Sequence, residues 1–445
     1  MSDALSIFAA GREVGPRIGL VADGHRYTYE VLASLTRDRV RALTPSVAPG
    51  EPHVVIGSNT LATAITLYAL FELRTPALLI HPRLTDAERV AQVRAIDRRE
   101  RPLPADAAAI LYTSGTTGTP RAAVLTRAAL VASAAASTAN LGWQDDDRWL
   151  LCMPVARIGG LSILTRCLAA RSCTVLAAGF DATTFTDGVA ADGITLASLV
   201  PTMLHRVLDA HPGWVPPPQL RAVLVGGAEA PPALLQRAQE RGLPIVLTYG
   251  MTETCSQVVA TPYAARHAPG DCGTGRALPG ADLRIRDGRI EVRGPMLMAG
   301  YAGEAPLPPG AWFDTGDLGT LDAAGCLQVH ARRTDLIVTG GENVYPAEVE
   351  RALEECPGIA AAGVFGVPDP VWGQWVAAAL VAGKAPPDDA ILAAHLAARL
   401  APYKRPRRIG YVARLPLTPA GKPDRSALAA LAGELRALSY PRDND

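Results

Sequence analysis

The sequence predicts an α/β fold: a large N-terminal domain of layered, mostly parallel sheets with helices and a small antiparallel unit, followed by a small α+β C-terminal domain. Short apolar runs alternate with helical patterns through the first two-thirds of the chain, as in parallel sheets covered by helices. From Gly273 onward, glycine and proline separate short strand-like runs, which indicates antiparallel pairing. A new set of helix and strand patterns begins at about Thr334. We therefore expect domains at residues 1–333 and 334–445.

The individual elements follow from these patterns. Near-continuous apolar runs, typical of strands buried on both faces, cover residues 54–57, 77–80, 148–152, 174–176, 222–225 and 245–248. Helical patterns cover residues 61–73, 86–98, 128–139 and 233–241. Strands at 283–285 and 289–292 and a loop at 303–310 form the antiparallel unit. The second domain is predicted to contain strands at 336–338, 360–367 and 375–381, with helices at 346–355 and 390–400.

Composition limits the classes of partner. Lys plus Arg and Asp plus Glu both number 43, so bulk charge gives no support for a nucleic-acid or membrane-surface partner. We expect no membrane span and no signal peptide, because neither an 18-residue apolar run nor a basic segment leading into an apolar one is apparent, and therefore a cytoplasmic protein. The seven cysteines include no C-x-x-C pair, which favours buried free thiols over disulfides or a metal site.

One loop has the chemistry of an anion site. Residues 111–121 read Leu-Tyr-Thr-Ser-Gly-Thr-Thr-Gly-Thr-Pro-Arg and follow an apolar run. Glycines allow close approach of the backbone, and amide and hydroxyl groups can donate hydrogen bonds to phosphate oxygens. Arg121 adds a cation, and the spacing does not fit a Walker A loop. Taken alone, such a segment is more often an ordinary surface loop.

Four more segments change that interpretation. They are Tyr-Gly-Met-Thr-Glu-Thr at 249–254, Phe-Asp-Thr-Gly-Asp-Leu at 313–318, Arg-Arg-Thr-Asp-Leu-Ile-Val-Thr-Gly-Gly-Glu-Asn at 332–343, and Leu-Thr-Pro-Ala-Gly-Lys-Pro-Asp-Arg at 417–425. With the loop, they resemble in order the signature motifs of the adenylate-forming superfamily of acyl- and aryl-CoA synthetases, luciferases and peptide-synthetase adenylation domains. The resemblance implies an AMP-forming acid–thiol ligase that uses ATP, Mg²⁺ and coenzyme A, with a mobile C-terminal domain.

The resemblance also implies roles for residues that bind the nucleotide. The loop residues that would hold the β- and γ-phosphates are Thr113, Ser114, Gly115, Thr116, Thr117 and Gly118, with Arg121 where the family usually has lysine. The adenosine would lie against Gly227, Ala228, Glu229, Tyr249, Gly250 and Met251, with its ribose on Asp317 and Arg332. Asp314 is more simply explained by an Asx-turn.

The remaining implied roles are chemical. Thr252 would contact phosphate and Glu253 would hold Mg²⁺, which prefers one or two carboxylates with phosphate and waters; the alternative is that both open a capped helix. Lys422 would bridge the acid and the α-phosphate and stabilise the charge that gathers there. Gly340 and Gly341 would line the path of the thiol after rotation about Thr334.

The acid is indicated by a narrower resemblance. Segments 141–155, 160–164, 249–257 and 332–337 are similar to 2-succinylbenzoate–CoA ligases of menaquinone biosynthesis. Those ligases have Pro-Leu-Phe-His where this chain has Pro-Val-Ala-Arg at 154–157. Arg157 is able to hold the second carboxylate of that acid by two parallel hydrogen bonds. The alternative is that this substitution has shifted the enzyme to another acid. The predicted acid site consists of Arg157, Gly160, Ser162, Ser256 and Gln257.

Other functions stay open at this point. One is ligation of a different aryl or acyl acid, with CoA or a carrier-protein thiol as acceptor. Another is a nucleotide-binding regulator without catalysis, which the presence of Lys422, Glu253, Asp317 and Arg332 disfavours. We expect the partners to be a small carboxylic acid, ATP and CoA, and homodimer formation is left open.

Overall fold

The computed structural model describes residues 3–48, 50–97, 100–113, 120–227, 230, 232–268, 271–331, 336–416 and 425–440. The chain divides into two compact units. The first consists of Met1–Pro82, Ile96–Thr113 and Ala122–Ala331, and the second of Arg83–Ala95, Ser114–Arg121 and Arg332–Asp445. The predicted mixed α/β fold is confirmed.

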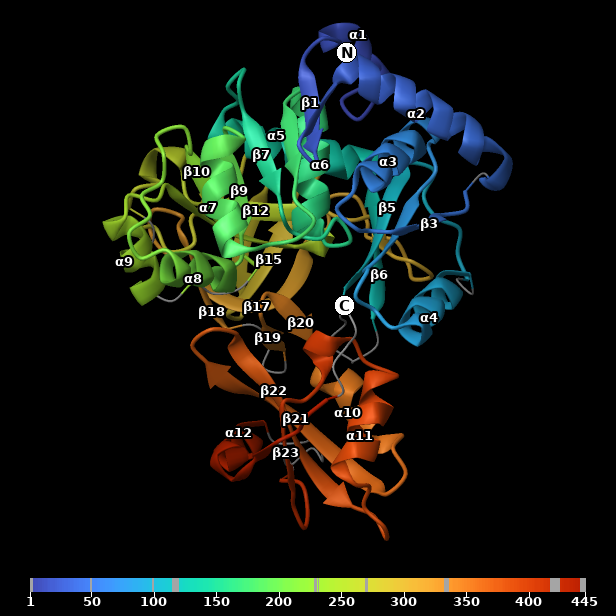
Figure 1. Cartoon of the computed structure of the whole chain (residues 1–445), viewed down its shortest axis with the longest axis vertical. Coiled ribbons are helices and arrows are strands. Elements are labelled where there is room, and N and C mark those ends of the chain that lie inside the picture. The colour runs from blue at the N-terminus through green and yellow to red at the C-terminus, as the bar shows by residue number, and fades with distance from the viewer. Residues whose placement is uncertain are drawn as a thin grey trace. The chain divides into compact units, whose positions relative to one another are not determined.

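The largest sheet of the first unit has nine strands in the order β13-β12-β11-β10-β9-β7-β8-β1-β2 (Figure 1). Its strands are β1 (Ile18–Ala22), β2 (His25–Thr28), β7 (Arg148–Leu151), β8 (Cys173–Leu176), β9 (Leu196–Leu199), β10 (Ala222–Val225), β11 (Ile245–Met251), β12 (Ser256–Ala260) and β13 (Arg276–Ala277). The six strands from β11 to β1 are parallel, and the edge strands are antiparallel. The carboxyl ends of six strands therefore meet at one edge, where ligands of open α/β sheets bind.

Two smaller sheets complete this unit. The five-stranded sheet contains β16 (Gly300–Tyr301), β6 (Arg121–Thr126), β5 (Ala107–Thr113), β4 (Ala77–Ile80) and β3 (His53–Ile56). The four-stranded sheet is antiparallel, as predicted, and contains β14 (Asp282–Arg286), β15 (Arg289–Arg293), β17 (Phe313–Leu321) and β18 (Leu327–Ala331). The prediction that residues 54–57 form a strand buried on both faces is wrong for β3. It is an edge strand, and its Val54 and Ile56 side chains are exposed.

Helices divide the interior of the first unit into two cores. Its helices are α1 (Ile7–Val14), α2 (Tyr29–Leu43), α3 (Leu61–Leu73), α5 (Arg127–Leu141), α6 (Ile158–Ala170), α7 (Ala182–Ala191), α8 (Pro201–Ala210) and α9 (Pro232–Glu240). Helix α4 (Asp86–Asp97) has residues in both units. Figure 1 shows α7, α8 and α9 grouped beside β9 and β10, where their apolar side chains form the smaller core. The larger core joins α1, α2, α3, α5 and α6 to the other faces of the sheets.

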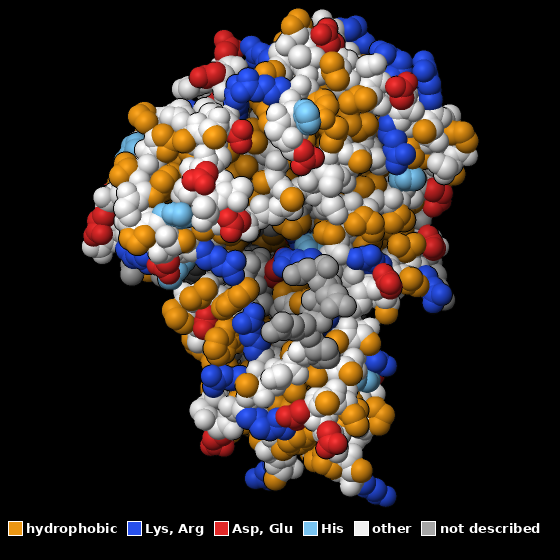
Figure 2. Space-filling model, in the orientation of Figure 1, with side chains coloured by type: hydrophobic (Ala, Val, Ile, Leu, Met, Phe, Trp, Pro, Cys, Tyr) orange, Lys and Arg blue, Asp and Glu red, His pale blue; other side chains and the backbone are white. Residues whose placement is uncertain are grey.

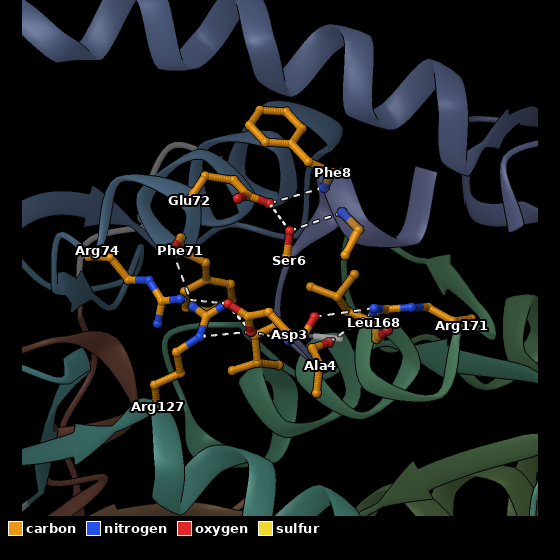
Figure 3. Close-up of polar contacts among 12 residues, drawn as sticks. Asp3, Ala4, Ser6, Phe8, Phe71, Glu72, Arg74, Arg127, Leu168 and Arg171 are labelled. Carbon is orange, nitrogen blue, oxygen red and sulfur yellow. Dashed lines mark hydrogen bonds and ion pairs between the residues drawn. The ribbon is translucent and has the colours of Figure 1, made fainter. Parts of the chain in front are cut away.

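Polar contacts fix the N-terminal segment to this unit (Figure 3). Arg127 Nη2 lies 2.6 Å from Asp3 Oδ1, and Arg74 Nη2 lies 2.7 Å from Asp3 Oδ2. Glu72 Oε1 accepts hydrogen bonds from the Ser6 hydroxyl and the Phe8 amide at 2.8 and 3.0 Å. The first turn of α1 is therefore held by side chains of α3 and α5 and by the residue that follows α3.

The second unit contains a six-stranded sheet with helices on both faces. Its elements are β19 (Ile337–Thr339), β20 (Glu342–Val344), α10 (Pro346–Glu354), β21 (Ile359–Asp369), β22 (Gly373–Ala382), α11 (Asp389–Ala397), β23 (Arg408–Tyr411), α12 (Arg425–Ala429) and β24 (Arg436–Ala437). Apolar side chains of α10 and α11 pack on one face of the sheet, and Leu428 of α12 belongs to a second apolar cluster with Phe365 and Ala377. The predicted strand pair corresponds to β21 and β22, which pair along their whole length.

Cys272 and Cys326 form a disulfide, so the prediction of free thiols is wrong for these two residues. The two cysteines are 54 residues apart in the sequence, so no local pattern indicates that they lie together. In the fold, the segment after Cys272 pairs with the start of β18. Thr274 N donates to Leu327 O at 2.9 Å, and Leu327 N donates to Gly275 O at 2.8 Å. The other five cysteines are free and buried, as predicted.

The surface carries charged side chains of both signs. Figure 2 shows acidic and basic side chains interspersed over the visible face of the first unit. In the part of the chain that the structure describes, no helix combines the length and apolarity that a membrane crossing needs.

Candidate active site

The motif at 249–254 forms a tight turn at the carboxyl end of the nine-stranded sheet. Strand β11 ends at Met251, residues 252–254 make one 3₁₀ turn, and β12 returns antiparallel, with Gly250 opposite Gln257. A side chain at position 250 would overlap the backbone of Ser256, so this position requires glycine. The alternative of a capped helix holds here in the form of a single capped 3₁₀ turn, in which the Met251 amide donates to Thr254 Oγ1 at 2.9 Å.

Glu253 is the carboxylate of this turn. It is buried, and its Oε1 accepts a hydrogen bond from the Tyr301 hydroxyl at 2.8 Å. Its own carbonyl accepts from the Met298 amide at 2.8 Å. Tyr301 lies in the two-residue strand β16, 48 residues away, and no motif in the sequence marks it.

The donor set fits Mg²⁺ supplied together with a nucleotide. Among the described residues no group of three or more His, Cys, Asp or Glu side chains could hold a metal ion. Glu253 would therefore contribute one carboxylate, and phosphate oxygens and waters would supply the remaining ligands. Mg²⁺ in nucleotide sites has this preference.

Tyr249 and Asp317 bring two motifs together. The Tyr249 hydroxyl donates to Asp317 Oδ2 at 2.8 Å across 68 residues of sequence, and both side chains are buried. In the same segment Asp314 Oδ1 accepts from the Gly316 amide at 2.8 Å, which confirms the predicted Asx-turn. Asp317 is therefore the carboxylate of this segment that accepts from the Tyr249 hydroxyl.

Other predicted nucleotide residues lie at the beginning or the end of a strand. Thr113 is the last residue of β5, Arg121 is the first of β6, and Gly227 follows β10 with φ +80°. Predicted residues outside the described part of the chain are Ser114, Gly115, Thr116, Thr117, Gly118, Ala228, Glu229, Arg332, Thr334 and Lys422.

The predicted acid-site residues lie at the start of α6 and in β12. Arg157 is the residue before α6, and a side chain at Gly160 would overlap the Pro154 carbonyl. The Ser162 hydroxyl, which is buried, donates to Gly159 O at 3.0 Å. Gln257 Nε2 donates to the Ser137 hydroxyl of α5 at 3.2 Å.

Asn59 is a positioning residue that the sequence did not reveal. Its Nδ2 donates to Met153 O and Ala177 O, each at 3.0 Å. Its Oδ1 accepts from the Val155 amide at 3.0 Å. One buried amide thus holds the loop that leads to Arg157, a role that depends on tertiary contacts and leaves no local signal.

In the second unit, Gly340 and Gly341 form the two-residue turn of the β19–β20 hairpin. Their φ angles are +58° and +81°, the pair of positive values that a type I′ turn requires. The Gly340 amide donates to Trp372 O at 2.8 Å. The consecutive glycines therefore have a structural reason in this hairpin, in addition to the role that the resemblance implies.

Comparison with known proteins gives one consistent result. Residues 91–302 match the AMP-binding enzyme family and residues 348–422 match the AMP-binding enzyme C-terminal domain. The 2-succinylbenzoate–CoA ligases of Bacillus licheniformis and Listeria monocytogenes are each 34% identical to the chain over 91% and 92% of its length, and each match covers 95% of the relative.

Solved structures agree with these matches. An o-succinylbenzoate CoA synthetase mutant from Bacillus subtilis, bound with its product analogue, superposes with a TM-score of 0.87 at 31% identity over 96% of this chain and 98% of that one. An amide bond synthetase from Marinactinospora thermotolerans gives a TM-score of 0.81 at 26% identity over 97% and 99%. The chain therefore belongs to the AMP-binding enzyme family, among its AMP-forming acid–CoA ligases.

Proposed function

We propose that this protein converts 2-succinylbenzoate to 2-succinylbenzoyl-CoA through an acyl-adenylate, with release of pyrophosphate and AMP. The observation that carries the nucleotide half of this proposal is the bond between Tyr249 and Asp317, which joins two separate motifs into one buried polar group. The choice of acid is supported by relatives named for that reaction that match more than nine-tenths of this chain.

The residues at the sheet edge would bind ATP. The Tyr249 ring would lie against adenine, and Asp317 would accept hydrogen bonds from the ribose hydroxyls. Glu253, oriented by Tyr301, would hold Mg²⁺. The ion, when bound, would neutralise charge on the phosphates. A solved relative, the o-succinylbenzoate CoA synthetase of Bacillus subtilis, binds ATP and magnesium ion. The loop at 113–118 and Arg121 would contact the β- and γ-phosphates.

The chemistry has two steps. In the first, a carboxylate oxygen of the acid attacks the α-phosphorus, the bond to the β-phosphate oxygen breaks, and pyrophosphate leaves. Lys422 would bridge the attacking oxygen and the α-phosphate and stabilise the charge that develops. In the second, the CoA thiol loses its proton and attacks the acyl carbon, and AMP leaves. We propose that residues 334–445 move about Thr334 between the steps and that Gly340 and Gly341 then line the path of the thiol.

The acid would lie against Arg157, Gly160, Ser162, Ser256 and Gln257. We place the enzyme in the cytoplasm, where both ATP and CoA are available.

The role of Lys422 gives the first test. Lys422→Ala should lower acid-dependent pyrophosphate exchange by about 10²–10³, the scale of one preorganised electrostatic contact. Transfer of the acyl group from preformed adenylate to CoA should change much less. The matched control is Lys384→Ala, which removes an exposed lysine of the same unit. Equal loss in both half-reactions, with the protein folded, would contradict the assignment.

The acid itself is tested by AMP release. Wild-type protein with ATP, CoA and 2-succinylbenzoate should release AMP faster than with benzoate, succinate or fatty acids. A protein that activates a simple monocarboxylic acid and ignores 2-succinylbenzoate would remove the substrate assignment and leave the ligase activity standing.

A further inference from the structure

The disulfide between Cys272 and Cys326 joins two sheets of the first unit. Cys272 lies four residues before β13, an edge strand of the nine-stranded sheet, and Cys326 directly precedes β18, an edge strand of the four-stranded sheet. Their Cα atoms are 5.3 Å apart. Beside the bond, the Thr274 amide donates to Leu327 O at 2.9 Å, and the Leu327 amide donates to Gly275 O at 2.8 Å. The covalent bond therefore reinforces a junction where two sheet edges meet through backbone hydrogen bonds.

Both edges lead to the residues of the proposed nucleotide site. In the nine-stranded sheet, Ala277 of β13 lies opposite Val259 of β12, and Val259 lies opposite Tyr249 of β11. In the four-stranded sheet, β18 pairs with residues 318–321 of β17, which directly follow Asp317. The Tyr249 hydroxyl donates to Asp317 Oδ2 at 2.8 Å. The disulfide and this hydrogen bond therefore connect the same two sheets at two points.

The disulfide lies near the surface. Cys326 is buried, but Cys272 is partly exposed, and residues 322–325, which lead to Cys326, are exposed. The five free cysteines are buried, and burial raises the pKa of the Cys152 thiol, for example, to about 12. A buried thiol that stays protonated at neutral pH reacts slowly. Thiol exchange is therefore expected first at the bond between Cys272 and Cys326.

A permanent disulfide is unusual in an enzyme that uses ATP and CoA. Both compounds are available in the cytoplasm, where the proposed function places this protein, and the thiols of that compartment reduce most protein disulfides. The disulfides that do form there are commonly transient and redox-sensing. The bond between the two sheets is therefore better explained as a reversible bond than as a permanent one.

We propose that Cys272 and Cys326 form a redox-sensitive switch that sets the affinity of the nucleotide site. The proposal rests on the proposed function for the identity of the nucleotide and for the compartment. In the oxidised form, the bond fixes the distance between the two sheets, so Tyr249 and Asp317 are held in position before ATP binds. Groups that are already ordered bind a ligand more tightly. In the reduced form, the junction opens locally more easily, and ATP has to order the pair.

Reduction is a two-electron exchange with a small dithiol. One thiolate of the dithiol attacks the sulfur of Cys272, the more exposed residue, and Cys326 leaves as a thiolate that takes up a proton. The second thiolate of the dithiol then attacks the mixed disulfide, and Cys272 leaves and is protonated in the same way. The protein gains two electrons and two protons, and the dithiol becomes a cyclic disulfide. Reoxidation reverses these steps with a small disulfide as the oxidant.

The reduced protein is expected to stay folded. Val259 of β12 and Leu327 of β18 belong to the same apolar core, and both side chains are fully buried. That packing does not depend on the covalent bond. The effect of reduction on the native protein is therefore local, at the junction and at the pair of Tyr249 and Asp317.

The test compares the two redox states without CoA, because the thiol of CoA would itself exchange with the disulfide. The dissociation constant of ATP and the KM for ATP in acid-dependent pyrophosphate exchange are measured for wild type isolated without reductant and for wild type reduced with dithiothreitol. Thiol titration of the unfolded protein should find five thiols before reduction and seven after it. Reduction should raise both ATP constants by about fivefold or more and change the KM for the acid little.

Variants assign the effect to this pair. The double variant Cys272→Ser with Cys326→Ser should bind ATP like the reduced wild type, with or without dithiothreitol. Cys272→Ser alone, which changes the more exposed residue, should do the same and guards against loss of folding at the buried position. Cys356→Ser is the matched control, because it removes a buried free thiol of the second unit and should keep the response to reduction.

Three outcomes would overturn the proposal. The first is seven titratable thiols before reduction. The second is a reduction that lowers the melting temperature and leaves both ATP constants unchanged, which describes a bond that only stabilises the fold. The third is a response to dithiothreitol that persists in the double variant. A protein that binds ATP but catalyses no exchange with 2-succinylbenzoate would contradict the proposed acid, and the ATP dissociation constants of its two redox states would still decide the role of the disulfide.

Discussion

Arg221 and Arg166 are both buried in the first unit, but within the described ranges only Arg221 has a carboxylate partner. Arg221 Nε lies 2.7 Å from Asp147 Oδ1, and its two terminal nitrogens donate to Leu141 O and Gly142 O at 3.0 and 2.6 Å. Asp147 is itself fully buried and also accepts from Thr195 and the Gln144 amide. Arg166 has an aromatic ring and no comparable acceptor among the described residues.

The difference separates two uses of a buried charge. At Arg221 the chain supplies both charges and every acceptor, so the ion pair belongs to the folded protein with or without a ligand. At Arg166 the described residues supply no acceptor for Nε or Nη2, and the cation lies against the Trp149 ring. Removing the cation should therefore lower the stability of the fold more at Arg221 than at Arg166.

The largest effect is expected for Arg221→Met. This change leaves the Asp147 carboxylate buried without its cation and should lower the free energy of unfolding by about 3–5 kcal/mol. Urea unfolding followed by tryptophan fluorescence measures it. In the double variant with Asp147→Asn the loss should be smaller than the sum of the two single losses, because the residues share one interaction. A loss below about 1 kcal/mol for Arg221→Met would contradict the expectation that the ion pair between Arg221 and Asp147 stabilises the fold.

An intermediate effect is expected where the ion pair is partly exposed, between Asp3 and Arg127. Burial raises the pKa of Asp3, but the hydrogen bond and charge of Arg127 outweigh it and hold the pKa below its ordinary value. A carboxyl whose pKa is depressed by folding contributes stability above its unfolded pKa and loses that contribution as pH falls through the folded value. Asp3→Asn should therefore lower the free energy of unfolding by about 1 kcal/mol at neutral pH.

The pH dependence provides the check on the Asp3 prediction. The difference between wild type and Asp3→Asn should stay constant from about pH 7 to 5 and shrink below about pH 4, as Asp3 becomes protonated. Urea midpoints at each pH measure the difference. A difference that grows on acidification would show that the charge of Asp3 is unfavourable in the folded protein.

Local features of this fold could be predicted from sequence. The helix predicted at residues 61–73 is α3, because Thr60 caps its start and Arg74 ends it in the left-handed conformation. The Asx-turn of Asp314 was predictable because its partner is two residues away. The ordered motifs also predicted that Tyr249 and Asp317 lie together, and the two side chains share a hydrogen bond.

Contacts between distant segments were not predictable in the same way. Tyr301 binds Glu253 across 48 residues, and Cys272 binds Cys326 across 54, with no local pattern at either pair. Arg166 shows a second limit. In the sequence it is one more arginine in a helical segment, and only its burial and the lack of an acceptor in the described structure distinguish it.

The smallest effect on the unliganded protein is expected for Arg166→Met. Methionine matches the length of the arginine stem and carries no charge, so the variant loses a cation–π contact and gains relief from an unpaired buried charge. These terms oppose each other, and the free energy of unfolding should change by less than about 1 kcal/mol. Urea unfolding in parallel with Arg221→Met makes the comparison direct. A loss as large as that of Arg221→Met would show that Arg166 has a structural acceptor.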